Sequence, residues 1–202
     1  MFESLAVFLE WMLTLYEWII IIAIIVSWVS PDPANPIVQF LNRMTLPLWS
    51  FLASRLPVAF RPFSAYASLL LIWFLKVFAP GTVLSIGGFV NDTVSFDSLL
   101  IKVVGFFLLG SAFVIQNFLF FLIILLLVWF FITLISPTVN NPIVQILVIL
   151  VDPFITPVQK RLPRSKIDLS PLIVAGIFYL LNMFAVSTLG TFAARLAHSG
   201  SI

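Results

Sequence analysis

Four long apolar runs alternate with shorter polar, proline-rich stretches along the chain. The runs cover about residues 8–29, 64–88, 112–135 and 170–192. About 20 apolar residues in a helix cross a hydrocarbon core of roughly 30 Å, and each run reaches that length. The pattern therefore predicts an all-α membrane protein with four transmembrane helices.

The segment before the third run allows two structures. Residues 99–111 are apolar but include Lys102 and Gly105. We expect them either to extend the third span outward as one helix or to lie along the membrane interface.

The two longer polar segments repeat one sequence pattern. Residues 30–39 (SPDPANPIVQ) return at 136–145 (SPTVNNPIVQ), and the offset of 106 residues holds as far as Ser64 and Ser170. The pattern predicts two parallel tandem repeats, each with a span, a connector and a second span. We expect repeat 1 at 1–90 with its connector at 30–63, an outward segment at 91–111, and repeat 2 at 112–202 with its connector at 136–169.

Each connector begins with a helix-start signal. Asn35-Pro36 and Asn141-Pro142 combine an N-cap asparagine with a proline at the first helical position, where the fixed φ of proline suits a helix. The helix that follows Asn141-Pro142 has Gln145 as its one polar residue over 143–151. Because such a helix covers only about 15 Å, it is too short to span, and we expect it to be re-entrant or packed under the bundle.

The first connector helix has the spacing of an amphipathic helix in the interface plane. Its polar face contains Gln39, Asn42 and Arg43, and its apolar face contains Ile37, Phe40, Leu41 and Met44.

Prolines predict where these helices end. Pro47 and Pro153 occupy the same position in the two copies, and proline inside a helix removes a hydrogen bond. We therefore expect each connector helix to break there and a second short piece to follow. At the start of the fourth span, we expect Ser170 to be the N-cap and Pro171 to take the first helical position.

Composition and charge agree with a membrane protein and give it an orientation. Apolar residues make up 62% of the chain and charged residues 9%, whereas soluble domains carry about 25% charge. Seven of the ten Lys and Arg lie in the two connectors, and residues 89–98 have none. The positive-inside tendency therefore predicts cytoplasmic connectors, with both termini and the middle loop outward. Basic residues so few and local give no indication of direct nucleic-acid binding.

Two opposite charges fall within the spans. Glu17 and Lys76 each lie roughly 18–20 Å from the connector end of their span, slightly beyond the midplane. A lone charge in a membrane is costly, so we expect the two side chains to pair if the spans pack together. The alternatives are outward snorkelling of Lys76, or an ion or proton path through Glu17. Repeat 2 has Ile123 and Asn182 at these positions.

No constellation in the sequence indicates an enzyme, a metal site or a cofactor. The chain has no cysteine, which excludes disulfides, thiolate metal ligands and Fe–S clusters. Its one histidine, His198, lies in the polar C-terminal tail. We therefore expect no catalytic residues, no bound metal and no cofactor.

The repeated Ser-Pro…Asn-Pro-Ile-Val-Gln connector resembles the YggT family, which includes YlmG proteins and plastid factors for cytochrome b6f assembly. The run 152–163 (DPFITPVQKRLP) and Asp168-Leu169-Ser170-Pro171 are also similar to that family. The resemblance covers nearly the whole chain and implies the two-repeat bacterial form in the inner membrane. It implies roles in osmotic tolerance, in organisation near division, or in assembly.

Together these features predict a non-enzymatic scaffold or assembly factor in the inner membrane. Its expected partners are the lipid bilayer and either another membrane protein or further copies of the chain. The alternative is a small-cation channel or transporter subunit linked to osmotic tolerance, with Glu17 and Lys76 in its path. The residues expected to dock a partner or anionic lipid lie in the connectors: Asn35, Pro36, Gln39, Arg55, Asn141, Pro142, Gln145, Asp152, Lys160, Arg161 and Asp168.

Overall fold

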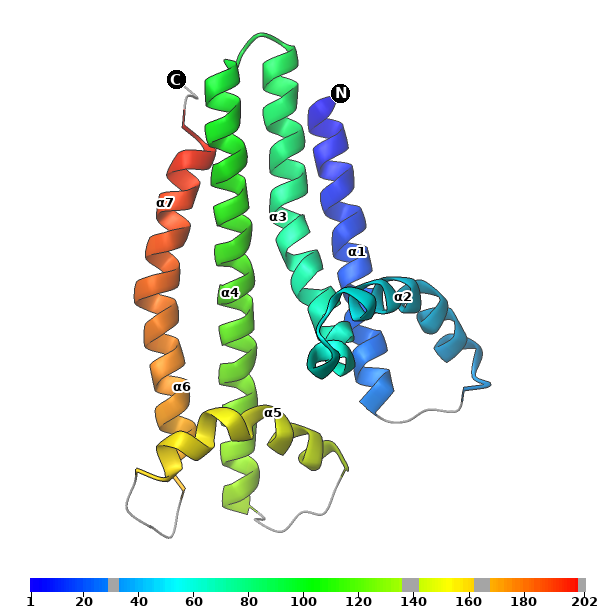
Figure 1. Cartoon of the computed structure of the whole chain (residues 1–202), viewed down its shortest axis with the longest axis vertical. Coiled ribbons are helices and arrows are strands. Elements are labelled where there is room, and N and C mark those ends of the chain that lie inside the picture. Colours follow the sequence, from blue (N-terminus) through cyan, green and yellow to red (C-terminus); the bar gives the residue numbers. More distant parts are fainter. Residues whose placement is uncertain (29–32, 136–141, 162–167, 200–202) are drawn as a thin grey trace. The chain divides into compact units, whose positions relative to one another are not determined.

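The computed structural model describes residues 1–28, 33–135, 142–161 and 168–199, and every element in these ranges is helical (Figure 1). Four helical stretches are long and apolar enough to cross a membrane: Phe2–Ser27, Val58–Val90, Phe96–Leu134 and Ser170–Ala197. The predicted all-α, four-span class is therefore confirmed. The elements are α1 (Phe2–Trp28), α2 (Pro36–Arg55), η1 (Val58–Phe63), α3 (Ser64–Val90), α4 (Phe96–Ile135), α5 (Pro142–Gln159), α6 (Ser170–Leu181), η2 (Asn182–Val186) and α7 (Ser187–Ala197).

The chain divides into two compact units. The first, here called unit 1, comprises Met1–Val114 and Leu189–Ile202, and the second, unit 2, comprises Ile115–Thr188. The helices α4 and α7 each contribute residues to both units.

Unit 1 is built on the antiparallel pair of α1 and α3, with α2 packed against both helices (Figure 1). Ile20, Ile24 and Ile72 form the buried centre of this contact, and Ile20 is fully buried. Many other apolar side chains of α1 are exposed, among them Trp11 and Trp18. An apolar helix that is only partly covered by protein is typical of a helix whose remaining surface faces lipid.

Three glycines bring the helices of unit 1 close together. A Cβ atom at Gly87 of α3 would lie 2.6 Å from the side chain of Phe2 in α1. A Cβ at Gly81 of α3 would collide with Phe106 of α4, and one at Gly105 of α4 would collide with the backbone of Ala197 in α7. Small residues let helices approach closely where lipid supplies no hydrophobic force. These contacts give the order α1, α3, α4, α7.

Unit 2 packs the second part of α4 against α5 and α6 around an apolar cluster. Leu126 of α4 is fully buried, and Val151 of α5 and Val174 of α6 are 1% and 4% exposed. The buried members of the cluster are Leu125, Leu126, Leu147, Val151, Ile155, Val174 and Ala175.

The third and fourth spans are longer than the sequence predicted. Residues 99–111 extend the third span, because α4 is one helix of 40 residues. Such a helix is about 60 Å long, twice the usual hydrocarbon thickness. The fourth span runs from Ser170 through the π-helical η2 to Ala197. Ala193 and Ala197 are buried in its last turns, so the helix continues there by packing. The mean hydropathy of these turns is lowered by their polar residues and does not indicate this packing.

The prediction that Pro47 and Pro153 break the connector helices is wrong. Pro47 lies inside α2 and Pro153 inside α5, and both helices bend but continue (Figure 1). Proline inside a helix costs about 3 kcal/mol, but packing of a helix face usually outweighs local propensity. In α5, buried Val151 and Ile155 lie on the two sides of the proline and hold the helix together.

Candidate functional site

The start of α2 is fixed by the predicted capping residues. Asn35 is the N-cap, and its side-chain oxygen accepts a hydrogen bond of 2.9 Å from the backbone N–H of Ile37. Pro36 occupies the first turn. The amide of Gln39 donates to the carbonyl oxygens of Pro33 and Ala34 at 3.4 and 3.3 Å. Gln39 therefore folds back on the chain before the helix and helps to hold the entry of α2.

The helix α2 buries one of its faces in unit 1. Val38, Leu41 and Thr45 point into the protein and are at most 9% exposed. Thr45 is tolerated there because its hydroxyl donates to the carbonyl of Leu41 at 2.9 Å.

The remaining apolar residues of α2 form a second, exposed stripe. Ile37, Phe40, Met44 and Phe51 are 65%, 50%, 44% and 53% exposed. Their spacing of three, four and seven residues places them on one side of the helix. The side that carries them is adjacent to the buried face, so α2 presents a packed, an exposed apolar and a polar side.

Basic side chains accompany this exposed stripe. Arg55 is exposed, and its guanidinium carbon lies 5.2 Å from the ring centroid of Phe51, which is a cation–π distance. Arg43 lines a shallow groove on the polar side of α2, together with Gln39, Asn42 and Ser50. The described part of the first connector, 33–63, contains no Asp or Glu. Its surface therefore favours anionic groups.

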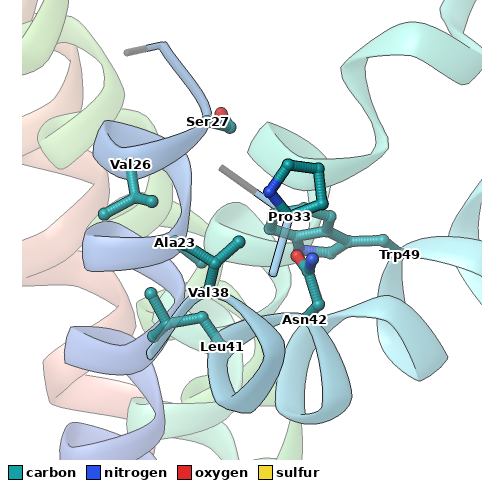
Figure 2. A pocket seen from close by; sticks show the side chains of 8 residues that line it. All are labelled: Ala23, Val26, Ser27, Pro33, Val38, Leu41, Asn42 and Trp49. Carbon is teal, nitrogen blue, oxygen red and sulfur yellow. The ribbon is translucent and has the colours of Figure 1, made fainter. Parts of the chain in front are cut away.

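A small pocket separates the end of α1 from the first half of α2 (Figure 2). Its volume is about 210 Å³, below the 300–1,000 Å³ that is usual for small-molecule sites. Its wall is mostly apolar, with the hydroxyl of Ser27 and the amide of Asn42 as polar groups. The lining residues are Ala23, Val26, Ser27, Pro33, Val38, Leu41, Asn42 and Trp49.

The second connector is described in part. The helix α5 begins at Pro142 as predicted, but Asn141 and the side chains of Pro142 and Gln145 lie outside the described residues. Asp152 is exposed within α5 and accepts a hydrogen bond of 2.8 Å from the hydroxyl of Thr156. Lys160 and Arg161 are exposed just beyond α5.

The expected capping of the fourth span by Ser170 is wrong, because Leu169 occupies the N-cap position and Asp168, one residue earlier, accepts a hydrogen bond from the first turn. One carboxylate oxygen of Asp168 accepts from the backbone N–H of Ser170 at 2.9 Å, and the other accepts from the amide of Gln159 at 2.9 Å. Asp168 therefore links the end of α5 to the start of α6. Ser170 is the first residue of α6, and its hydroxyl is buried without a hydrogen-bond partner in the described residues.

The intramembrane charges meet in the middle of unit 1. The Lys76 ammonium lies 2.5 Å from one carboxylate oxygen of Glu17, and the Trp73 indole N–H donates to the other at 2.8 Å. The Glu17 and Lys76 side chains are 16% and 21% exposed. A carboxylate with a cation on one oxygen and a donor on the other is stabilised against the low dielectric around it.

Sequence reasoning missed three polar contacts around this pair. Trp73 lies three residues before Lys76 and so on the same face of α3. The Trp49 indole N–H donates to the hydroxyl of Ser68 at 3.0 Å, and the Tyr16 hydroxyl donates to the carbonyl of Met44 at 2.9 Å. The bonds of Trp49 and Tyr16 connect α2 to α3 and to α1. Their partners lie 19 and 28 residues away along the chain, and no local pattern in the sequence indicates that they meet.

The described residues hold no group of three or more His, Asp and Glu that is placed to bind a metal ion. The site therefore consists of the connector surfaces and the charge pair.

Comparisons with known proteins agree with this architecture. The family model described as CCB3/YggT matches residues 2–84 and 108–189, which include both connectors. YggT of Escherichia coli K12 is 25% identical over 182 residues, which cover 90% of this chain and 88% of that protein. The YggT proteins of E. coli O6:H1 and O157:H7 are similar to the same extent. No solved structure matches. With the family model spanning most of its length, this multi-pass membrane protein belongs to the CCB3/YggT family.

Proposed function

We propose that this protein is a non-enzymatic scaffold of the bacterial inner membrane that holds a partner protein or anionic lipid on its connectors. The observation that carries this proposal is the exposed apolar stripe of α2 beside basic residues. Apolar groups exposed at this density on one side of a helix mark a surface that lipid or another protein covers.

The distribution of charge supports a cytoplasmic position for the connectors. Arg43, Arg55 and Arg61 belong to the first connector, and Lys160 and Arg161 to the second. Near an anionic leaflet each basic residue adds about 1 kcal/mol of attraction. Both termini then face the opposite side.

The proposal is tested by purifying the full-length protein from native membranes within its own lipid. Protein and phospholipid that co-purify are quantified by mass spectrometry for the wild type and Arg55→Glu. Lys102→Glu is the matched control, because it makes the same charge change outside the connectors. We expect Arg55→Glu to lose a stoichiometric protein or to deplete anionic lipid, and the control to lose neither.

The identity of what is lost separates the two kinds of partner. Loss of a protein identifies an assembly factor, and loss of anionic lipid identifies a lipid-organising role. Equal recoveries from the wild type and Arg55→Glu would contradict the proposal.

The alternative of a small-cation path through Glu17 has less support. Both carboxylate oxygens of Glu17 already have partners, Lys76 and Trp73. A permeating cation would have to displace one of them. Cation flux into liposomes that depends on Glu17 would restore this alternative.

A further inference from the structure

The outer side of α7 carries a polar stripe that the proposed function does not use. Ala193 and Ala197 are 0% and 3% exposed and pack into unit 1. Thr191 and Arg195 are exposed, and their spacing of four residues places them on the side of the helix opposite to these alanines. Arg195 therefore presents a positive charge on the open side of α7.

The helix α1 carries an acidic stripe. Glu10 and Glu3 precede Glu17 by seven and fourteen residues, and because seven residues fall about 20° short of two helical turns, they are turned by about 20° and 40° from Glu17 around α1. Glu17 is paired with Lys76, whereas Glu3 and Glu10 are exposed. Within the described residues neither Glu3, Glu10 nor Arg195 takes part in an ion pair.

These two stripes do not meet within one copy. Helices α3 and α4 lie between α1 and α7 in the order that the glycine contacts establish. Glu10 and Arg195 are therefore opposite charges on different edges of unit 1.

The charges lie at matching depths. Phe2 lies against Gly87, and because α1 and α3 are antiparallel, Gly81 is level with about residue 8 of α1. Phe106 contacts Gly81, and its ring centroid lies 6.0 Å from that of His198. Residue 8 is therefore level with His198. At 1.5 Å per residue, Glu10 lies about 3 Å and Arg195 about 4.5 Å from this level, both away from the turn between α3 and α4.

A second pair of residues shows the same match. Thr14 lies about 9 Å from the level of His198, and Thr191 lies about 10.5 Å from it, in the same direction. Glu10 and Thr14 on α1 are therefore at nearly the same depths as Arg195 and Thr191 on α7, and Glu10 and Arg195 have opposite charges.

We propose that α1 of one copy packs against α7 of a second copy, and that the Glu10 carboxylate pairs with the Arg195 guanidinium of that copy. The pair joins two exposed charges of opposite sign, and neither has an ion-pair partner within the described residues of its own copy. Contact of α1 with α1 would oppose Glu10 to Glu10, and contact of α7 with α7 would oppose two Arg195 side chains. Like charges across an interface are unfavourable. The association therefore joins unlike edges, head to tail.

Disulfide cross-linking tests this contact directly, since the chain has no cysteine of its own. Thr14→Cys and Thr191→Cys are made in separately tagged full-length copies, which are co-expressed and oxidised in native membranes. A disulfide forms only when the two Cα atoms come within about 7 Å. We expect a cross-linked dimer that carries both tags. Absence of that dimer would overturn the proposal.

A mismatched pair provides the control. Ile25 is exposed on α1 but lies about 16 Å deeper than Thr14. Ile25→Cys combined with Thr191→Cys is therefore expected to give no dimer. Equal yields from the matched and the mismatched pairs would show random collision and would also overturn the proposal.

Charge exchange tests the ion pair itself. Glu10→Arg and Arg195→Glu each place like charges at the contact, and we expect each to lower the oligomer fraction about tenfold or more in native mass spectrometry. The double exchange restores opposite charges and is expected to restore the oligomer. Circular dichroism establishes that each variant keeps its helices. Monomers throughout, or a double variant as impaired as the single ones, would contradict the pairing. Because the contact involves α1 and α7 alone, its failure leaves the proposed connector function intact.

Discussion

The interiors of the two units are alike in position and different in chemistry. Residues 106 apart share their burial: Ile20 and Leu126 are both fully buried, and Thr45 and Val151 are 0% and 1% exposed. Yet unit 1 joins its helices with hydrogen bonds and an ion pair, whereas the core of unit 2 is an apolar cluster. The difference teaches that buried positions 106 residues apart can belong to a core with directional polar contacts in one unit and to an apolar cluster in the other.

The substituted positions show where the difference arises. Glu17 and Lys76 of unit 1 correspond to Ile123 and Asn182, while Trp49 and Ser68 correspond to Ile155 and Val174. In each case both residues of a polar contact in unit 1 are replaced by other residues in unit 2. Replacing both partners of a buried polar contact is far less costly than removing one.

The largest expected effect comes from breaking the ion pair on one side. Lys76→Asn introduces the residue of unit 2 and leaves the Glu17 carboxylate without its cation. We expect the free energy of unfolding in mixed micelles to fall by about 3 kcal/mol or more. Glu17→Ile combined with Lys76→Asn is expected to cost clearly less than the sum of the single changes. Additive losses would show that the two side chains do not stabilise each other.

A smaller effect is expected from the apolar cluster of unit 2. Leu126→Ala removes a fully buried side chain and leaves a cavity, which costs about 2–4 kcal/mol in the same unfolding measurement. Leu134→Ala is the matched control in α4, because Leu134 is 45% exposed, and we expect a change within about 0.5 kcal/mol. Similar decreases in the free energy of unfolding at both positions would mean that the buried leucine contributes no more to stability than the exposed one.

The smallest effects are expected from two buried serines and should have opposite signs. The Ser68 hydroxyl accepts from Trp49 and donates to the Ala65 carbonyl at 2.5 Å, so Ser68→Ala is expected to lower stability by about 1 kcal/mol. Within the described residues the Ser170 hydroxyl has no partner, and Ser170→Ala is expected to leave stability unchanged or raise it by up to about 1 kcal/mol. Thermal unfolding of both variants decides the signs. A loss at Ser170 as large as that at Ser68 would contradict the contrast.

The sequence was sufficient for features that depend on local chemistry. The spans follow from runs of apolar residues, and Asn35-Pro36 starts α2 because a cap and a proline act within one turn. The meeting of Glu17 and Lys76 in unit 1 follows from equal depth and the cost of an unpaired charge.

Features that depend on packing were not accessible in this way. The continuation of α2 through Pro47 depends on packing, because Thr45 before the proline is buried and Leu48 and Trp49 after it pack against the core of unit 1. The hydrogen bonds of Asp168 to the Ser170 N–H and to the Gln159 amide depend on where α5 ends relative to the start of α6. The neighbours α1 and α3 determine which apolar residues of α2 are covered, and the sequence of α2 by itself does not contain that information.

The bond between Glu17 and Lys76 also has a consequence for how the protein is made. The two residues are 59 positions apart, so at 5–20 residues per second the ribosome completes Lys76 about 3–12 s after Glu17. Throughout that interval α1 carries a carboxylate whose insertion costs about 3 kcal/mol without its cation. The arrival of α3 removes this cost. Neutralisation of the Glu17 charge is thus completed by a helix that is synthesised after α1.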